Sequence, residues 1–200
     1  MPTHTAKNLF TKNITSAEDC LALYDAMIGL KPGVDITWVL RAGIVFIVSA
    51  IDTYFHDKIK YGIGKAARGN MPDSLANFKI PISELESWEQ AKRKGNIYRN
   101  WVVKYYSTKS LQSPIDIADA LKIIGIQSYW DKIEPDKKKR QVLRSKFNKL
   151  ISRRNKISHE GDRLTSRSSG KKLRDIDREN ILHWIKFAKD LIIKTEKEFP

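Results

Sequence analysis

The most apolar stretch of the chain lies between residues 35 and 61. If this stretch forms a helix, its hydrophobic side chains cover most of the helix circumference. A helix that is apolar nearly all round lies at the centre of a fold. Its β-branched residues would also suit a strand, but its length favours a helix. A polar line with steps of three and four residues faces either a basic partner or water at the rim of a bundle. This line consists of Ser49, Asp52 and His56.

Shorter amphipathic segments flank this central helix and are separated by glycine and proline turns. A capping box from Thr15 to Glu18 predicts that a helix begins there, so we expect residues 1–14 to form a flexible N-terminal arm. The pattern predicts a single all-α domain over residues 15–200, with one long central helix and short accessory helices. Further helices are expected at residues 83–107, 114–124, 127–133, 135–158 and from 175 nearly to the end, with a short one within 71–81.

The chain is strongly basic. Its 200 residues are 41% hydrophobic, an ordinary globular composition, but they carry a formal net charge of +14. Residues 131–172 contain 15 Lys and Arg against 5 Asp and Glu, so this segment holds +10 of the total. Such clustering predicts a polyanionic partner, with RNA or DNA first and an anionic membrane surface second. The alternative is a solvated helix face that serves solubility.

The cysteine and histidine content limits the cellular compartment and the kinds of catalytic site that can be expected. A single cysteine, Cys20, excludes an internal disulfide and suits a reducing compartment. The first residues lack a signal-peptide core, and the longest apolar run, residues 42–51, is about half the length that spans a bilayer. We therefore expect a cytoplasmic protein without a membrane partner. None of the histidines stands at metal-ligand spacing, so no metal and no cofactor is expected. The histidines are His4, His56, His159 and His183.

The basic segment ends in a compact group of chemically capable residues, Arg154, Asn155 and His159, followed by Gly161. Arg154 falls on the apolar stripe of the preceding helix, and a guanidinium on a buried face needs an anion or a hydrogen-bonding partner. Asn155 and His159 are four residues apart and share a helix face. Gly161 predicts that the helix ends just after His159.

This group resembles a known signature. Arg154 followed after four residues by His159, with Asn155 directly after the arginine, is similar to the motif of the HEPN superfamily, and the local string is most similar to the RiboL-PSP-HEPN type. Residues 40–57 and 113–130 resemble the same group. The resemblance implies an all-α, HEPN-type helical bundle that is usually a homodimer. Many members are metal-independent RNases of prokaryotic defence or toxin systems, whereas others bind nucleotides or partners without catalysis.

The resemblance implies an endoribonuclease that needs no metal, since RNA carries its own nucleophile, the 2′-OH. His159 would take the proton of that hydroxyl as general base, and Arg154 would bind the scissile phosphate and stabilise its extra negative charge. Asn155 would orient the phosphate or His159. Asp52 matches an acidic position that often lies near the Arg/His pair in the family, where it would orient Arg154 or fix the tautomer of His159.

The resemblance leaves some points open. One histidine provides a base but no acid for the leaving group, which the implied homodimer would supply from its second copy. Gly161 stands where toxins regulated by a nucleotidyltransferase antitoxin often carry a tyrosine, and this departure puts that form of regulation in doubt. Residues 160–173 form a basic loop beside His159 that is expected to close over a bound strand.

We expect the basic residues on and after this helix to contact RNA, with tRNA as one candidate substrate. Two other functions stay open: a non-catalytic module that binds RNA, a nucleotide or a protein partner through the same surface, and a DNA-binding regulator. A cognate inhibitor or a trigger protein would be a further partner. The expected RNA contacts are Arg153, Lys156, Lys137, Lys138, Lys139, Arg140, Lys146 and Arg163.

Overall fold

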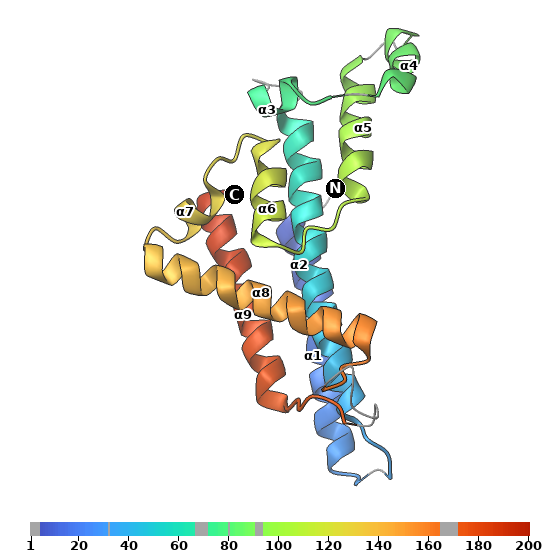
Figure 1. Ribbon diagram of the computed structural model, residues 1–200, viewed down its shortest axis with the longest axis vertical. Helices are drawn as coiled ribbons and strands as arrows, with labels where there is room; N and C mark the ends of the chain where they lie inside the picture. The colour runs from blue at the N-terminus through green and yellow to red at the C-terminus, as the bar shows by residue number, and fades with distance from the viewer. Residues whose placement is uncertain (1–4, 32, 67–71, 80, 91–93, 165–171) are drawn as a thin grey trace.

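A computed structural model describes residues 5–31, 33–66, 72–79, 81–90, 94–164 and 172–200 (Figure 1). The fold is all-α, as the sequence predicts, and its described part contains no strand, only an isolated antiparallel bridge between Arg163 and Leu173. The elements are α1 (Ala6–Ile28), α2 (Thr37–Ala66), α3 (Asp73–Ala76), the 3-10 helix η1 (Ile82–Glu84), α4 (Leu85–Gln90), α5 (Lys94–Ser107), α6 (Pro114–Lys122), α7 (Tyr129–Ile133), α8 (Lys137–Glu160) and α9 (Arg178–Glu198).

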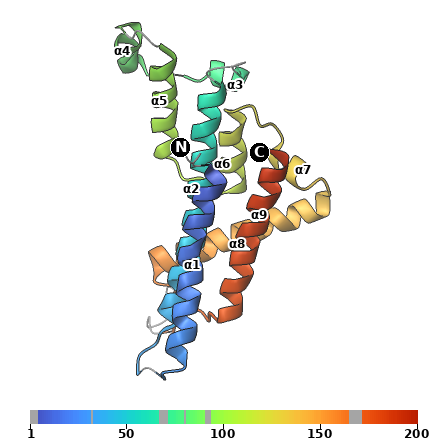
Figure 2. The ribbon, with the colours of Figure 1, turned by 180° about the vertical axis from the view of Figure 1, so that it is seen from behind.

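The predicted central helix is α2, and the other long helices pack on it. α2 runs back antiparallel along α1, and α9 lies next to both (Figure 1). The view from behind brings α1 and α9 to the front and α8 to the back, so α8 crosses the bundle on the face opposite α1 (Figure 2). α5 and α6 cover the C-terminal half of α2. The core therefore lies around the middle of α2.

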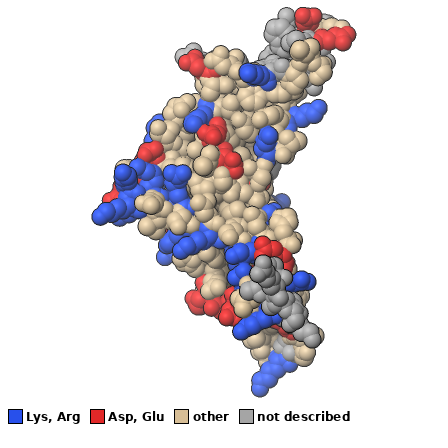
Figure 3. Space-filling view, in the orientation of Figure 1, with Lys and Arg blue, Asp and Glu red and all other residues tan. Residues whose placement is uncertain are grey.

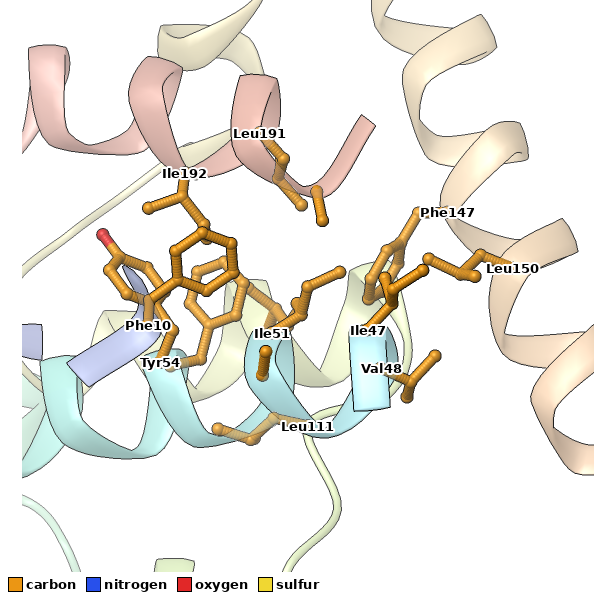
Figure 4. Packing of buried hydrophobic residues seen from close by; sticks show 14 of the residues in the cluster. Phe10, Ile47, Val48, Ile51, Tyr54, Leu111, Phe147, Leu150, Leu191 and Ile192 are labelled. Carbon is orange, nitrogen blue, oxygen red and sulfur yellow. The ribbon is translucent and has the colours of Figure 1, made fainter. Parts of the chain in front are cut away.

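Large apolar side chains meet at this point from four helices. Ile47, Val48, Ile51 and Tyr54 of α2 are buried. Burying one large apolar side chain stabilises a fold by about 1.5–3 kcal/mol, so contacts from several sides fix α2 firmly in place. The facing residues include Phe10 of α1, Phe147 and Leu150 of α8, and Leu191 and Ile192 of α9 (Figure 4).

Among the described helices, α2 is the one whose length and composition would suffice to cross a membrane. This is weak evidence for a span, because the core helix of a globular domain has the same character. In its most apolar window, 56% of the residues are buried inside the protein. The contacts with α1, α8 and α9 account for that apolar character.

The predicted flexible arm over residues 1–14 is wrong for residues 6–14, which are the first turns of α1. The side chain of Thr5 caps the helix by accepting a hydrogen bond from the N–H of Asn8 at 3.3 Å. Phe10 and Ile14 are buried on the stripe that continues to Leu21. Thr15 is no N-cap; its hydroxyl donates to the carbonyl of Thr11 at 3.1 Å inside the helix. Tertiary burial thus overrides the local capping signal.

The other predicted helices are present, with one difference. Ser113 caps α6 as expected, accepting a hydrogen bond from the N–H of Asp116 at 3.0 Å, with Pro114 in the first turn. The single helix predicted over residues 83–107 is divided between η1, α4 and α5. Its predicted capping box, Ser83 to Glu86, spans the junction of η1 and α4, and residues 91–93 lie outside the described part of the chain.

Replacement of Phe10 tests whether the first turns of α1 belong to the core. Phe10 is 4% exposed, and its ring contacts that of Tyr54 edge-on with centroids 6.1 Å apart. Phe10→Ala should lower the free energy of unfolding by about 3–5 kcal/mol, because it leaves a cavity. The control Leu23→Ala removes a half-exposed apolar side chain of the same helix and should cost less than about 1 kcal/mol. If urea denaturation showed the same loss of stability for Phe10→Ala and Leu23→Ala, the first turns of α1 would not be part of the core.

Candidate functional site

The candidate residues lie on α8, whose two ends are both defined by local bonds. Asp136 caps its start by accepting a hydrogen bond from the N–H of Lys139 at 2.8 Å. Gly161, with a φ of 60°, ends it, and the N–H of Asp162 donates to the carbonyl of Lys156 at 2.8 Å. A left-handed residue after the last turn is the usual helix stop, so the predicted end just after His159 is confirmed.

A buried carboxylate immediately after α8 organises this end of the molecule. Asp162 is 0% exposed, and its Oδ2 accepts hydrogen bonds from Arg41 Nε and Arg153 Nη2, each at 2.8 Å. Arg41 comes from α2, and Arg153 comes from α8. One carboxylate oxygen thus joins the central helix to the end of α8.

The same two arginines also bind the segment that leads into α9. Arg41 Nη2 donates to the carbonyl of Arg174 at 2.9 Å, and Arg153 Nη2 donates to the carbonyl of Asp175 at 3.0 Å. The backbone carbonyl of Asp162 accepts from the N–H of Arg174 at 2.9 Å. Burial lowers the pKa of the Arg153 guanidinium from its ordinary value, and the charge of Asp162 opposes that shift.

Arg153 therefore has a structural role that the prediction of an RNA contact missed. Its guanidinium donates hydrogen bonds to the carboxylate of Asp162 and to the backbone carbonyls of Arg174 and Asp175. Arg140 is also engaged within the chain: its Nη1 pairs with Asp131 Oδ1 at 2.9 Å and donates to the carbonyl of Glu134 at 3.2 Å. It stabilises the turn between α7 and α8.

Arg154 is in a different position. Its Nη1 donates to Oδ1 of Asn155 at 3.1 Å, and no carboxylate in the described part of the chain pairs with it. Its Nε is buried and has no hydrogen-bond partner among the described residues. Asn155 and His159 are exposed one turn apart. One end of α8 thus carries an amide, an imidazole and a cation that has no counter-ion among the described residues.

This end of α8 can be compared with known proteins. The family model of RiboL-PSP-HEPN matches residues 12–199. The chain belongs to the RiboL-PSP-HEPN family. No curated protein and no solved structure matches the chain. Membership of the HEPN superfamily supports an RNase or an RNA-binding module as the general class of function.

The Asp52 predicted to assist the HEPN pair has other partners. Its Oδ1 accepts a hydrogen bond from the N–H of Leu111 at 2.8 Å, and its Oδ2 lies 3.5 Å from Nε2 of His56. No bond joins it to Arg154 or His159 in the residues described, so the predicted link is not present in this structure. A backbone N–H entering the core needs an acceptor, and Asp52 supplies it.

The other predicted RNA contacts are distributed along α8, except Arg163, which follows it. Lysine and arginine side chains gather over the start of α8 and continue along it (Figure 3). Within the predicted closing loop, residues 165–171 lie outside the described part of the chain. The described residues contain no group of three or more His, Cys, Asp or Glu placed to hold a metal ion. The exposed predicted contacts are Lys137, Lys138, Lys139, Lys146 and Arg163, and Lys156 is half-buried.

Sequence reasoning missed Asp162 and Arg41 of the HEPN fold. Arg41 carried a usable signal, because a charged residue within the nearly continuous apolar pattern of α2 requires a buried partner. Asp162 carried less, since its partner on α2 is 121 residues away and no local pattern encodes that pairing.

Replacement of the shared carboxylate should destabilise the fold strongly. Asp162→Asn leaves two partly buried guanidiniums without an anion, and removing one partner of a buried ion pair costs about 3–5 kcal/mol of unfolding free energy. Asp25→Asn is the matched control, because Asp25 pairs with Arg178 on the surface. It should cost at most about 1 kcal/mol. If urea denaturation gives both variants the same midpoint, Asp162 does not hold this end together.

Proposed function

We propose that this HEPN protein is a metal-independent endoribonuclease, with His159 as general base and Arg154 as the ligand of the scissile phosphate. The observation that carries the proposal is the different position of two adjacent arginines. Arg153 is bound to Asp162, whereas Arg154 lacks a carboxylate partner in the described structure and donates to Asn155, which lies one turn before His159 on α8. A guanidinium of this kind favours a phosphate, whose oxygens fit its planar donors.

The reaction follows from what these groups can exchange. Nε2 or Nδ1 of His159 takes the proton of the RNA 2′-OH, and the 2′ oxygen attacks the adjacent phosphorus. The Arg154 guanidinium stabilises the added negative charge of the phosphorane. The bond from phosphorus to the 5′ oxygen then breaks, and this oxygen receives a proton. The products are a 2′,3′-cyclic phosphate and a 5′-OH.

The leaving 5′ oxygen needs an acid, and His159 is the one histidine of α8. A symmetric homodimer that places two copies of the α8 end together would supply a protonated second His159. One imidazole would then act as base and the other as acid. The exposure of Asn155 and His159 leaves this end of α8 accessible to a second copy.

The second candidate is a non-catalytic module that binds RNA through the same surface. The basic exposed residues of α8 favour it, because phosphate binding requires only positive charge and hydrogen-bond donors. The two functions differ in the role of His159, which is essential for cleavage and dispensable for binding. A role in prokaryotic defence or growth control rests on family membership alone.

Cleavage assays with EDTA test the enzyme directly. Wild-type protein should cut total tRNA or a long single-stranded RNA and leave cyclic-phosphate ends. His159→Ala should reduce the rate about 10²–10⁴-fold through loss of the general base, and Arg154→Ala about 10²–10³-fold through loss of charge stabilisation. His183→Ala, which removes another exposed histidine, should leave the rate unchanged.

Two outcomes would count against this proposal. Equal cleavage by all variants would place the chemistry elsewhere or in a contaminant. An inactive wild type that binds RNA as tightly as His159→Ala would favour the non-catalytic module.

A further inference from the structure

α8 carries a second feature, which extends well beyond the signature and includes Asn155 and His159 at its end. Seven side chains recur along it at steps of four and three residues, so they form one straight stripe on the helix surface. All seven are exposed. Each is a hydrogen-bond donor, and none is acidic. This donor stripe consists of Lys137, Gln141, Arg144, Asn148, Ser152, Asn155 and His159.

The donor stripe is not used to hold the fold together. None of its side chains donates a hydrogen bond to, or forms an ion pair with, another described residue; Asn155 accepts one from Arg154 through its carbonyl oxygen. α8 has no acidic residue between Lys137 and His159. An ordinary solvated helix face mixes both signs of charge in pairs three or four residues apart. This face lacks them.

The buried residues next to the stripe on the same helix explain why the stripe points outward. Phe147, Leu150 and Ile151 are buried in the core and fix the rotation of α8 about its axis. Arg144 and Asn148 lie beside that apolar stripe, on the flank that stays exposed. The donors are therefore presented in a fixed register.

The surface is hollowed beside the N-terminal half of the stripe. One shallow depression of about 460 Å³ is lined by Lys137, Gln141, Arg144 and Asn148, together with Arg140 and Ser145. A neighbouring depression of about 460 Å³ lies between α8 and the α6–α7 turn and shares Arg140 and Arg144 with the first.

The second depression contains both polar and apolar groups. Its two carboxylates are already neutralised: Asp119 pairs with Lys122 at 2.7 Å, and Asp131 pairs with Arg140 at 2.9 Å. Its remaining lining includes Ile115, Ala118, Gln127, Tyr129 and Trp130. Tyr129 and Trp130 are buried, so the apolar surface open to a ligand is mainly Ile115, which is 63% exposed and suits contact with the face of a base next to a phosphate held by Arg144.

We infer that the donor stripe is a track for the backbone of a single-stranded polynucleotide, with Arg144 as a distal phosphate site remote from His159. This inference rests on the proposed function for its direction, because the strand would run from the depressions at the start of α8 to the reacting phosphate at its end. Fifteen residues of α-helix separate Arg144 from His159, about 22 Å. At roughly 3.4 Å per stacked nucleotide, this distance corresponds to about six or seven nucleotides.

Binding of uncleavable 2′-O-methyl RNA tests the track without requiring catalysis. Anisotropy titrations with single strands of about 4, 8 and 12 nucleotides should show affinity rising until the strand reaches both ends of the stripe, then levelling off. Arg144→Glu should weaken binding of the longest strand at least about tenfold and leave the shortest nearly unchanged. It should also reduce the slope of log affinity against log salt by about 1.

Lys149→Glu is the matched control, because it makes the same change of charge on an exposed residue of α8 outside the stripe. An equal loss with Lys149→Glu would mean that the net positive field binds RNA without a track, and would overturn the inference. Affinity independent of strand length, or tighter binding of duplex of equal length, would also overturn it.

The binding and cleavage outcomes can be told apart. If Arg144→Glu loses long-strand binding and the wild type cleaves no RNA, the track is supported and the proposed endoribonuclease activity is contradicted. If Arg144→Glu binds long strands normally and cleavage depends on His159, the track is contradicted and the proposed endoribonuclease activity is supported. Circular dichroism of each variant excludes loss of the fold as the cause.

Discussion

The arrangement of the candidate site depends on one buried carboxylate shared by two arginines. Asp162 stands one residue after the glycine that ends α8, and its Oδ2 binds the guanidiniums of Arg41 and Arg153. A buried anion is tolerated only with such partners, and each partner tolerates burial only because the anion is there. The result is a fixed connection between α2, the end of α8 and the segment before α9. The positions of Asn155 and His159 follow from it, since they lie on the last turns of the helix that this connection holds.

The charge balance at this connection also bears on the ligand. Asp162 supplies one negative charge to the two guanidiniums of Arg41 and Arg153, so this cluster keeps an excess positive charge. The next residue of α8, Arg154, adds a further positive charge. Part of the Arg154 guanidinium is buried, where positive charge is less screened by water than on the surface. A phosphate at this end of α8 would satisfy Arg154 and reduce the excess. Among the described residues, the end of α8 therefore carries part of the excess positive charge of the chain.

Local signals predicted the parts of the structure that depend on local bonds. The all-α class, the central α2, the Ser113 cap and the helix end at Gly161 are all confirmed. The N-terminal arm was wrong because the Thr15 capping box is a local pattern, whereas the helix from Ala6 is stabilised by burial of Phe10 and Ile14 against distant residues. Asp162, Arg41 and the actual partners of Asp52 could not be predicted, since each involves residues far apart in the sequence.

The division of α8 into a packed face and an exposed donor face has a consequence for how this sequence can change. Substitutions along the exposed stripe remove no core contact, so they change the folding free energy little. Selection can then alter which polymers the helix recognises while the bundle stays the same. Two descendants of one ancestor would keep superimposable cores and differ in their targets. In this chain, five positions of the stripe, from Lys137 to Ser152, can therefore change without disturbing either the core or the proposed catalytic pair.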